Sequence, residues 1–512
     1  MGRFYLSAIL VVLTLVFAPV LLLSLRHEDR FEGKVVLYNS YPAKAKSLDM
    51  ATCGDTISAA LQAQVYEPLY AYHYLKRPVE LIADVAEDMP SMSADGLTCT
   101  IRIRKGIRYA PNPCFGLNAD GSPRTRSVRA EDFVLSFKRA ADFHIQTPMA
   151  WTFLSGRIRG LDEFRAACEK YREGDFSRYD LPVEGIRALD EHTLEMRLTN
   201  PYPQLVHVLA MHCYSAMPRE VIDYYLTREP LERRTAQITR PEQMVGTGAF
   251  RVSEWNDGGR IVFERNPVYD HGVYPAEGAP GDEESGLLVD AGKPLPFIDV
   301  ICYEYIAEDL PMWLGFLSRQ YDVSAIPRDV FGSVIGPDRG LLEKWAKRGI
   351  RLVKFTDPSV FWYAFNMEDP LFGTSKSLRQ AMSLGFNADD YIEVLFNGRG
   401  KRPTNILPDS FPCHDEAGAS PYSRFDPEAA RAKLEAARGE LARAGLLDRD
   451  GNIPQITVDL GGRDEFARSS GEFTQRQFER LGLRVKIELN DWPTLQQKVH
   501  NKQVQVYGMG WH

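Results

Sequence analysis

The fold class is decided by residues 456–489, ITVDLGGRDEFARSSGEFTQRQFERLGLRVKIEL. This stretch predicts a strand over Ile456–Leu460, a helix over Phe473–Leu481 and a second strand over Val485–Leu489. A strand-helix-strand order is typical of a parallel layer, because parallel strands need a long crossover connection that is usually a helix. The sequence therefore predicts an α/β protein.

A well-delimited helix is predicted just before this stretch. Asp426 is a favoured N-cap residue, Pro427 suits the first helical position, and Glu428 places a negative charge in the first turn. The helix is predicted to run to about Ala444, and Gly445 ends it. A helix at this point fits the alternation expected of an α/β layer.

Shorter elements are predicted along the rest of the chain from period-two and period-3.6 patterns. They are a strand over Val35–Asn39, a helix over Thr56–Tyr66, an alternating strand over Leu97–Arg104, a helix over Ser127–Ala141, and hairpins over Ile186–Leu198 and Gly246–Glu264. The stretch Ala276–Lys293 is rich in glycine, proline and acidic residues, and it is predicted to be a surface insertion.

Bulk composition limits the possible function classes. The chain has 512 residues, enough for two or three domains, and its 44% hydrophobic and 25% charged residues are typical of a folded protein. The formal net charge of −8 gives no support for binding to nucleic acid. The seven cysteines contain no CxxC pair, and both disulfides and buried reduced thiols remain open. They are Cys53, Cys99, Cys114, Cys168, Cys213, Cys302 and Cys413.

The N-terminus carries the compartment signal. Arg3 precedes an uncharged stretch of 22 residues, Phe4–Leu25, which is long enough to cross a bilayer as a helix. Its end is a poor cleavage site and has no cysteine for a lipid anchor, so an uncleaved signal anchor is predicted, with a cleaved signal as the alternative. Either interpretation puts the remainder of the chain outside the cytoplasm.

Motifs for catalysis and cofactor binding are absent from the sequence. It contains no HExxH and no GxSxG, and Gly398-Arg399-Gly400-Lys401 is followed by Arg402 instead of Ser or Thr. His212 and His414 each neighbour a cysteine, but an isolated pair is not a zinc ligand set. We therefore predict no catalytic residue, no metal site and no cofactor.

Short motifs follow one another in a fixed order from residue 65 onward. They are Val65-Tyr66-Glu67-Pro68-Leu69, Asp95-Gly96-Leu97-Thr98, Val128-Arg129-Ala130-Glu131-Asp132, Val245-Gly246-Thr247-Gly248-Ala249-Phe250 and Arg379-Gln380-Ala381. Their residues and their order resemble the motifs of the peptide/nickel-type solute-binding proteins of ABC importers, which are the oligopeptide- and dipeptide-binding family 5. Pro68 departs from the family, which has glycine there, as does the insertion 276–293.

The resemblance implies a type II periplasmic-binding-protein-like fold, with two lobes, a hinge and an extra subdomain on lobe I. The implied divisions are an N-terminal signal anchor (1–30), lobe I (31–70 and 183–358, with the insertion near 276–293), the extra subdomain (71–182) and an incomplete lobe II (359–512). The final residues, Val506–His512, resemble the family's strand leading into a ligand-binding loop. The resemblance thus predicts a C-terminal truncation that omits the loop aspartate which pairs with a ligand amine.

The same resemblance implies capture of a peptide, or a similar small solute, in the interlobe cleft. ABC permease subunits with their ATPase are the implied partners, and the membrane is contacted through the N-terminal segment. The residues expected to face the ligand are Gly54, Asp55, Thr56, Trp362, Tyr363, Gly510 and Trp511.

Several alternatives remain open at this point. Asp55 is also a candidate N-cap, and Trp362 and Tyr363 are also candidates for core packing in a strand. The other functions considered are a membrane-tethered solute sensor or peptide-capturing chaperone without transport, and an atypical hydrolase. Nickel chelates, oligosaccharides and opines also remain possible ligands within the family.

Overall fold

The computed structural model describes residues 30–256, 259–355, 359–408, 414 and 418–511. The chain divides into two compact units, unit 1 (Met1–Ala325) and unit 2 (Ile326–His512), each with its own hydrophobic core. Both contain helices and sheets, which confirms the α/β class. Lobe II was predicted to begin at residue 359, whereas unit 2 begins at Ile326; the finer lobe boundaries stay predictions.

The predicted signal anchor over Phe4–Leu25 lies outside the described residues. Within the described part of the chain, no helix is both long and apolar enough to cross a bilayer.

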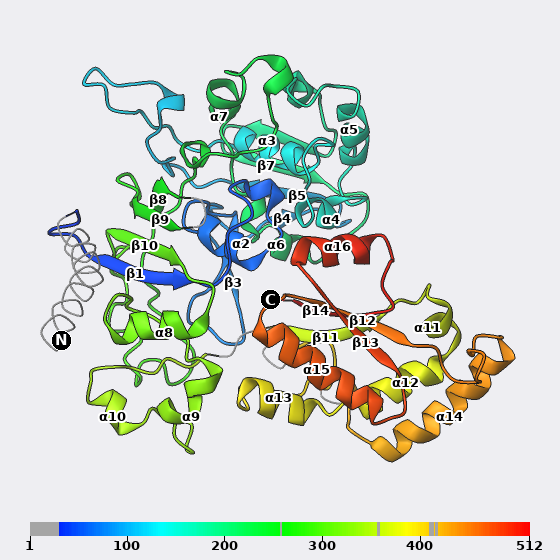
Figure 1. The fold of residues 1–512 in the computed structure, drawn as a ribbon. Coiled ribbons are helices and arrows are strands. Elements are labelled where there is room, and N and C mark those ends of the chain that lie inside the picture. Colours follow the sequence, from blue (N-terminus) through cyan, green and yellow to red (C-terminus); the bar gives the residue numbers. More distant parts are fainter. Residues whose placement is uncertain (1–29, 257–258, 356–358, 409–413, 415–417, 512) are drawn as a thin grey trace, which may run out of the picture. The chain divides into compact units, whose positions relative to one another are not determined.

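The first sheet of unit 1 has the strand order β1-β10-β9-β8 (Figure 1). Strands β1 (Val36–Tyr41) and β10 (Val300–Tyr305) are parallel, while β9 (Arg260–Arg265) is antiparallel to both β10 and β8 (Phe250–Trp255). The pair β8–β9 confirms the predicted hairpin. Because Phe263 enters the main core and the neighbouring Val262 a smaller cluster, apolar side chains cover both faces of the sheet.

The second sheet of unit 1 has the order β4-β5-β7-β6 and is antiparallel throughout. Its strands are β4 (Ser91–Met92), β5 (Thr98–Arg102), β6 (Ile186–Asp190) and β7 (Thr193–Arg197). The predicted alternation of β5 is confirmed, since Cys99 and Ile101 are buried opposite Met196 and Leu194. Helix α3 (Ala130–Ala140) packs on this sheet with Phe133 and Phe137 fully buried.

The remaining elements of unit 1 are short. They are η1 (Met50–Thr52), α2 (Thr56–Gln62), β2 (Tyr70–Tyr72), β3 (Leu81–Ala83), η2 (Pro113–Phe115), α4 (Ala150–Leu154), α5 (Leu161–Cys168), η3 (Phe176–Asp180), α6 (Leu205–Val208), η4 (His212–Tyr214), α7 (Arg219–Val221), η5 (Ile222–Leu226), η6 (Leu231–Arg233), η7 (Pro241–Gln243) and α8 (Asp309–Leu317). Much of unit 1 is therefore irregular chain between short helices.

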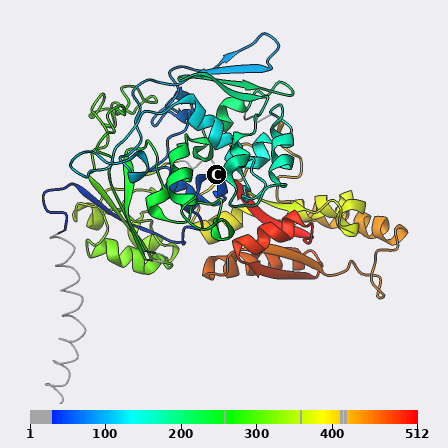
Figure 2. The same ribbon diagram turned by 90° about the horizontal axis from the view of Figure 1, so that it is seen from above.

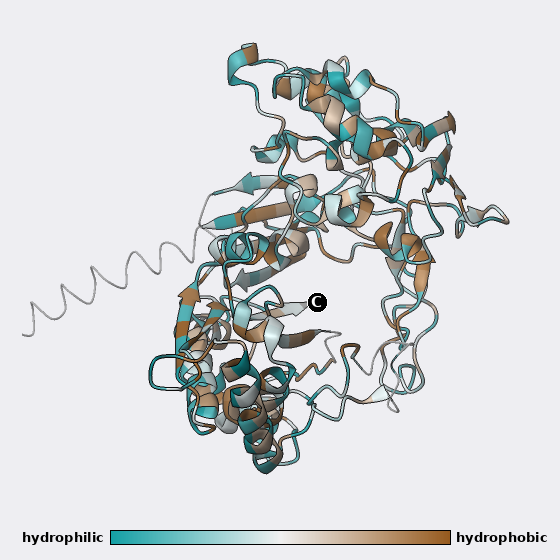
Figure 3. Cartoon of the chain, turned by 90° about the vertical axis from the view of Figure 1, so that its right-hand side faces the viewer, coloured by the Kyte–Doolittle hydropathy of each residue, from teal (hydrophilic) through white to brown (hydrophobic). Residues whose placement is uncertain are grey.

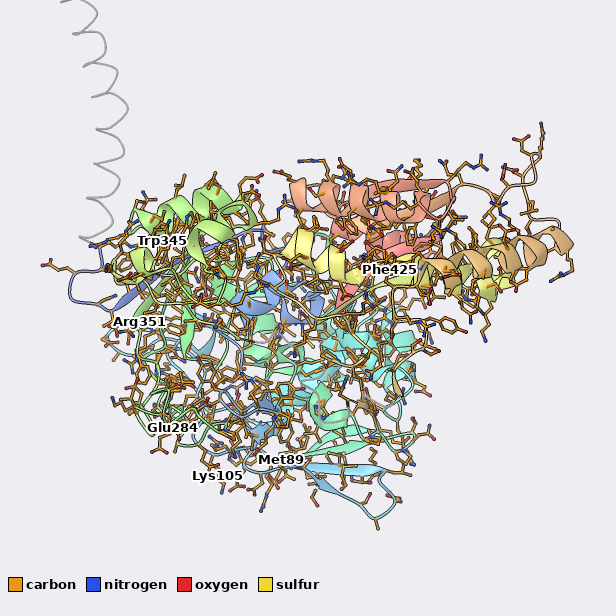
Figure 4. The ribbon with its side chains drawn as sticks, turned by 90° about the horizontal axis from the view of Figure 1, so that it is seen from below. Met89, Lys105, Glu284, Trp345, Arg351 and Phe425 are labelled. Atoms are coloured by element: carbon orange, nitrogen blue, oxygen red, sulfur yellow. The ribbon has the colours of Figure 1, made fainter. Side chains whose placement is uncertain are left out.

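Exposed turns form the stretch 276–293, as predicted, and Glu284 in it is labelled in Figure 4.

The six described cysteines, which exclude Cys413, are free thiols. Five of them are buried, and burial raises the pKa of Cys53 and of Cys99 to about 12. Of the two possibilities left open by the sequence, all six are therefore reduced, and five of them follow the buried interpretation.

The sheet of unit 2 has the order β11-β14-β12-β13. Strands β12 (Ile456–Gly461) and β13 (Val485–Asn490) are parallel, which confirms the strand-helix-strand prediction, and β12 is also parallel to β14 (Val506–Trp511). The first strand, β11 (Val360–Phe365), is antiparallel to β14. Helix α15 (Glu465–Glu479) connects β12 to β13 and packs against both. It begins earlier than predicted because Asp464 caps it through the main-chain N–H of Ala467.

The remaining regular elements of unit 2 are helices, with irregular chain between them. They are η8 (Arg328–Val330), α9 (Phe331–Val334), α10 (Glu343–Ala346), α11 (Pro370–Thr374), α12 (Lys376–Gly385), α13 (Ala388–Phe396), α14 (Pro427–Arg443) and α16 (Trp492–His500). Helices α12 and α14 lie side by side (Figures 1 and 2), and Glu440 accepts hydrogen bonds from the hydroxyls of Ser375 and Ser377. Hydrophilic and hydrophobic residues interleave along the helices (Figure 3), as expected for elements with one buried face.

Candidate ligand-binding site

The first predicted ligand loop, Gly54–Thr56, lies in unit 1 and leads into α2, whose first residue is Thr56. A Cβ on Gly54 would stand 2.9 Å from Cγ of Pro148, so the absence of a side chain allows this close approach. Both carboxylate oxygens of Asp55 accept bonds from Ser58, one from its main-chain N–H at 2.9 Å and one from its hydroxyl at 2.8 Å. Asp55 is thus the N-cap of α2, which confirms the alternative interpretation, while Thr56 is exposed at the first helical position.

Buried polar groups behind this loop fix its shape. The hydroxyl of Ser58 accepts the main-chain N–H groups of Lys46 and Ser47, and the amide of Gln62 donates to the carbonyl of Ser47. The side chain of Gln62 also bonds Nε2 of His212 at 3.0 Å. Burial lowers the pKa of His212 to about 4, so this ring is neutral at neutral pH.

Four predicted ligand residues lie on two adjacent strands of unit 2. Strand β11 carries Trp362 and Tyr363, and β14 carries Gly510 and Trp511. In the register of the pair, Trp362 is opposite Met509, and Val360 is opposite Trp511. The structure therefore brings these backbone positions together, although they are far apart in the sequence.

The side chains of Trp362 and Tyr363 belong to opposite faces of the sheet, because successive strand residues alternate. The hydroxyl of Tyr363 bonds that of Thr474 on α15 at 2.7 Å, and its ring packs against Phe386 in the core of unit 2. Burial raises the pKa of Tyr363 well above its ordinary value. Core packing is therefore the role of Tyr363.

Glycines on β14 make room for the aromatic rings of β11. A Cβ on Gly510 would lie 2.3 Å from the ring of Phe361, and one on Gly508 would lie 2.9 Å from Leu460 and 3.4 Å from the ring of Tyr363. Phe361 remains 61% exposed even so. Gly510 thus acts by leaving space for a neighbouring ring.

The opposite face of the sheet, named here the polar sheet face, carries Trp362, Tyr507, Met509, Asp459 and Glu488. The register places Trp362 opposite Met509 and places Asp459 between Tyr507 and Glu488 on the flanking strands. Trp362, Tyr507 and Met509 are each partly exposed. Partly exposed aromatic and thioether side chains suit a ligand that has apolar groups and can also meet the polar tip of a tyrosine.

Lys498 of α16 reaches this face and balances its charge. Its ammonium group pairs with Asp459 and, at 3.0 Å, with Glu488, and Asn490 donates to Asp459 at 3.0 Å. Burial lowers the pKa of Lys498, but the bonds to the two carboxylates outweigh burial and leave it raised. Bonds from Lys486 and Lys498 lower the pKa of Glu488 to about 2.

Asp459, Lys498, Tyr507 and Met509 were not among the predicted site residues. Only Asp459 left a signal, as a charged residue in the otherwise apolar strand ITVDL. A group of three or more His, Cys, Asp or Glu side chains able to hold a metal ion is not found in the described part of the chain. The Gly54–Thr56 loop and the polar sheet face are therefore candidate surfaces for binding a ligand.

A family model for bacterial extracellular solute-binding proteins, family 5 (middle region), matches residues 80–512. The chain belongs to this family. The match covers both the second sheet of unit 1 and the whole of unit 2. It confirms the resemblance found in the sequence motifs.

Curated relatives include the oligopeptide-binding protein OppA of Bacillus subtilis, 21% identical over 94% of this chain and 75% of the relative's length. The periplasmic OppA of Escherichia coli is 25% identical over 81% of this chain and 64% of the relative's length. The chain therefore spans about two thirds to three quarters of these relatives' own lengths.

Solved structures with the same fold include the murein tripeptide binding protein MppA of Escherichia coli, at a TM-score of 0.67 and 18% identity. Peptide-bound OppA of Listeria monocytogenes has a TM-score of 0.63 at 20% identity. Each comparison covers 94% of this chain, with 80% of the MppA chain and 81% of the OppA chain. These likenesses confirm the type II periplasmic-binding-protein fold.

Proposed function

We propose that this protein captures peptides outside the cytoplasm and delivers them to an ABC permease for import. The observation that carries the proposal is the family match over residues 80–512, together with the relatives named for oligopeptide binding. The proposal includes retention by the predicted N-terminal anchor. It involves capture alone, with no bond made or broken in the ligand.

The edge strand β11, which carries Trp362 of the polar sheet face, supports the proposal of peptide binding in unit 2. In the described residues, β11 is an edge strand that pairs only with β14. An extended peptide can add to such an edge through main-chain hydrogen bonds, which tolerate many side chains. The partly exposed Trp362 on this strand would supply an apolar contact beside the added backbone.

In unit 1 we propose that the Gly54–Thr56 loop contacts the ligand through main chain and through the exposed Thr56. Both oxygens of Asp55 are already occupied by Ser58, so Asp55 would shape the loop. If Asp55 instead paired directly with a cationic ligand group, replacing its charge would weaken the binding of basic peptides more than that of other peptides.

The test measures thermal stabilisation and calorimetric binding of the full chain with mixed tripeptides and tetrapeptides. We expect micromolar affinity, about −8 kcal/mol, and a ligand-dependent rise in melting temperature. Trp362→Ala should weaken binding about tenfold, because a partly desolvated aromatic contact is lost.

Phe425→Ala is the matched control, since Phe425 is a partly exposed aromatic residue of unit 2 outside β11 and β14 (Figure 4). It should leave peptide affinity unchanged. Bound peptide should be recovered intact by mass spectrometry, whereas cleaved peptide would support a hydrolase. Stabilisation by saccharides or nickel chelates, and by no peptide, would overturn the proposed ligand class.

A further inference from the structure

Unit 2 contains a strongly basic stretch of sequence that shares no residue with the polar sheet face. Residues 343–355, EKWAKRGIRLVKF, carry five basic residues and one acidic residue, in a chain whose formal net charge is −8. The basic residues are Lys344, Lys347, Arg348, Arg351 and Lys354, and all five are exposed. We name residues 343–355 the basic segment. Its net charge of +4 means that the rest of the chain is still more acidic than the total suggests.

A single helical turn, α10, organises the first half of the basic segment. Trp345 is held by a bond of 2.9 Å from its indole N–H to the carbonyl of Ser333. The charged ends of Lys344 and Arg348 lie 5.4 and 5.2 Å from the Trp345 ring centre. The turn closes at Gly349, whose φ of +80° favours glycine. Trp345 and Arg351 are labelled in Figure 4.

The second half combines positive charge with exposed apolar side chains. Val353 is 79% and Phe355 82% exposed, the two largest values among the large hydrophobic residues of unit 2 that the structure describes. They alternate with Lys354, whose ammonium group is 3.4 Å from the carbonyl of Arg339. Two neighbouring apolar side chains exposed to this degree beside cations form a surface that combines charge with apolar contact.

We propose that the basic segment docks on the surface of a bilayer that contains anionic phospholipids. Lysine and arginine side chains are attracted to anionic headgroups, and the neighbouring Val353 and Phe355 can enter the boundary between headgroups and acyl chains. A soluble polyanion would use the cations but would leave both apolar side chains in water. The net-negative remainder of the chain is repelled by an anionic surface, so attraction to that surface has to come from a locally basic stretch such as residues 343–355.

The test is sedimentation of the full chain with vesicles of pure phosphatidylcholine or with about one third phosphatidylglycerol. The predicted N-terminal span would add similar affinity for both vesicle types, so the compared quantity is the ratio of the two. We expect binding to the anionic vesicles to be about tenfold stronger or more, with the difference reduced at about 0.5 M salt by screening. Amide hydrogen exchange should slow in residues 343–355 only with anionic vesicles.

Two variants separate the contributions of charge and apolar contact. Lys344→Glu/Arg351→Glu/Lys354→Glu should reduce the ratio about tenfold or more, to near unity. Val353→Ser/Phe355→Ser should reduce it several-fold while leaving the charge unchanged. Arg431→Glu/Arg449→Glu/Arg480→Glu is the matched control, since it changes the net charge equally at exposed positions of unit 2.

Three results would overturn the proposal. The first is equal binding to both vesicle types. The second is an equal loss of binding in the control variant, which would mean that net charge alone decides it. The third is insensitivity to Val353→Ser/Phe355→Ser combined with full competition by polyaspartate, which would indicate a polyanion site. Peptide affinity in solution is measured separately, so failure here is distinguishable from failure of peptide capture.

Discussion

Buried charge is used differently in the two units. In unit 1, Arg139 and Asp49 form a two-bond ion pair at 2.6 and 3.1 Å, and each side chain is 1% exposed. In unit 2, Lys498 pairs with the buried Asp459 but keeps 22% of its own side chain exposed. One unit has enclosed both charges of a pair, while the other leaves the cation at the margin of a sheet.

The enclosed pairs of unit 1 join irregular chain to helices, since Arg139 lies in α3 and Arg178 in η3, whereas Asp49 and Asp142 lie outside the helices. Asp49 accepts bonds from Arg139, from the main chain of Ala51 and from the main chain of Ile238. A second pair, Arg178 with Asp142, works in the same way, and Arg178 also donates to main-chain carbonyls nearby. Fully buried ion pairs therefore fix irregular chain of unit 1 beside its sheets, whereas the pair of unit 2 lies on the sheet itself and stays partly hydrated.

The largest effect is expected for Asp49→Ala. This variant leaves the guanidinium of Arg139 buried without its carboxylate, which costs about 3–5 kcal/mol of the free energy of unfolding. Denaturant unfolding with hydrogen exchange in α3 measures it and assigns it to unit 1.

The exposed pair Arg102–Asp88 provides the matched control. Arg102→Ala should cost under about 1 kcal/mol, because both side chains are more than 60% exposed. The double variant Asp49→Ala/Arg139→Met should recover part of the loss, since no unpaired charge remains. A loss below about 1 kcal/mol for Asp49→Ala would remove the distinction between the two units.

The second prediction concerns unit 2, where Asp459→Asn should cost about 2 kcal/mol. The effect is smaller than for Asp49→Ala because Lys498 keeps Glu488 at 3.0 Å and remains partly hydrated. Hydrogen exchange in β12 and β13 is the local measurement. Lys498→Met leaves Asp459 buried without its cation and should lower the free energy of unfolding at least as much. If neither variant changes the free energy of unfolding, the Lys498–Asp459 pair does not stabilise the sheet.

Regular structure in unit 2 was predictable because its signals are local. The apolar runs of β12 and β13 and the Asp-Pro-Glu start of α14 lie within a few residues of what they determine. The ion pairs of unit 1 were not predictable, since Asp49 and Arg139 are 90 positions apart. Many arginines and aspartates are available, and only the folded topology selects which two are enclosed together.

In the candidate site, too, local features could be predicted from the sequence and long-range contacts could not. Capping by Asp55 and core packing by Tyr363 were both open from sequence, because each depends on a neighbouring helix or strand. The separation of Trp362 from Tyr363 follows from strand alternation once the strand is known. The contact of Lys498 with Asp459 joins α16 to β12, and a single sequence offers no pattern for such a pair.

A titratable cluster in unit 1 gives the third prediction. Nε2 of His271 lies 3.1 Å from both carboxylate oxygens of Glu67, with Asp84, Tyr269 and Arg104 facing the same group. Burial, then the charge of Glu67, raises the pKa of Asp84 to about 7. Burial lowers the pKa of His271, but Glu67 outweighs burial and leaves it raised.

Both shifts have the same sign in the linkage between pH and stability. At these two groups the folded state binds protons more tightly than the unfolded state, so their contribution to the free energy of unfolding should rise as pH falls from about 8 toward 5. His212, whose pKa is lowered to about 4, contributes in the opposite direction. Asp84→Asn removes a buried charge and should stabilise the protein by about 1–2 kcal/mol at pH 8, with little effect near pH 4. Denaturant unfolding across this range measures the effect, and a variant with an unchanged pH slope would contradict it.

The smallest effect is expected at the start of α14, where Asp426 accepts the main-chain N–H of Ala429 at 2.9 Å. Asp426→Ala removes this cap and should cost about 1 kcal/mol. Asp426→Asn keeps an oxygen for the cap but loses the exposed ion pair with Arg424, so the difference between the variants isolates the cap. Hydrogen exchange should report the loss mainly in the first turn of α14. An equal loss in both variants would assign stability to an exposed charge pair, and unit 2 would then depend on charge more than its regular structure implies.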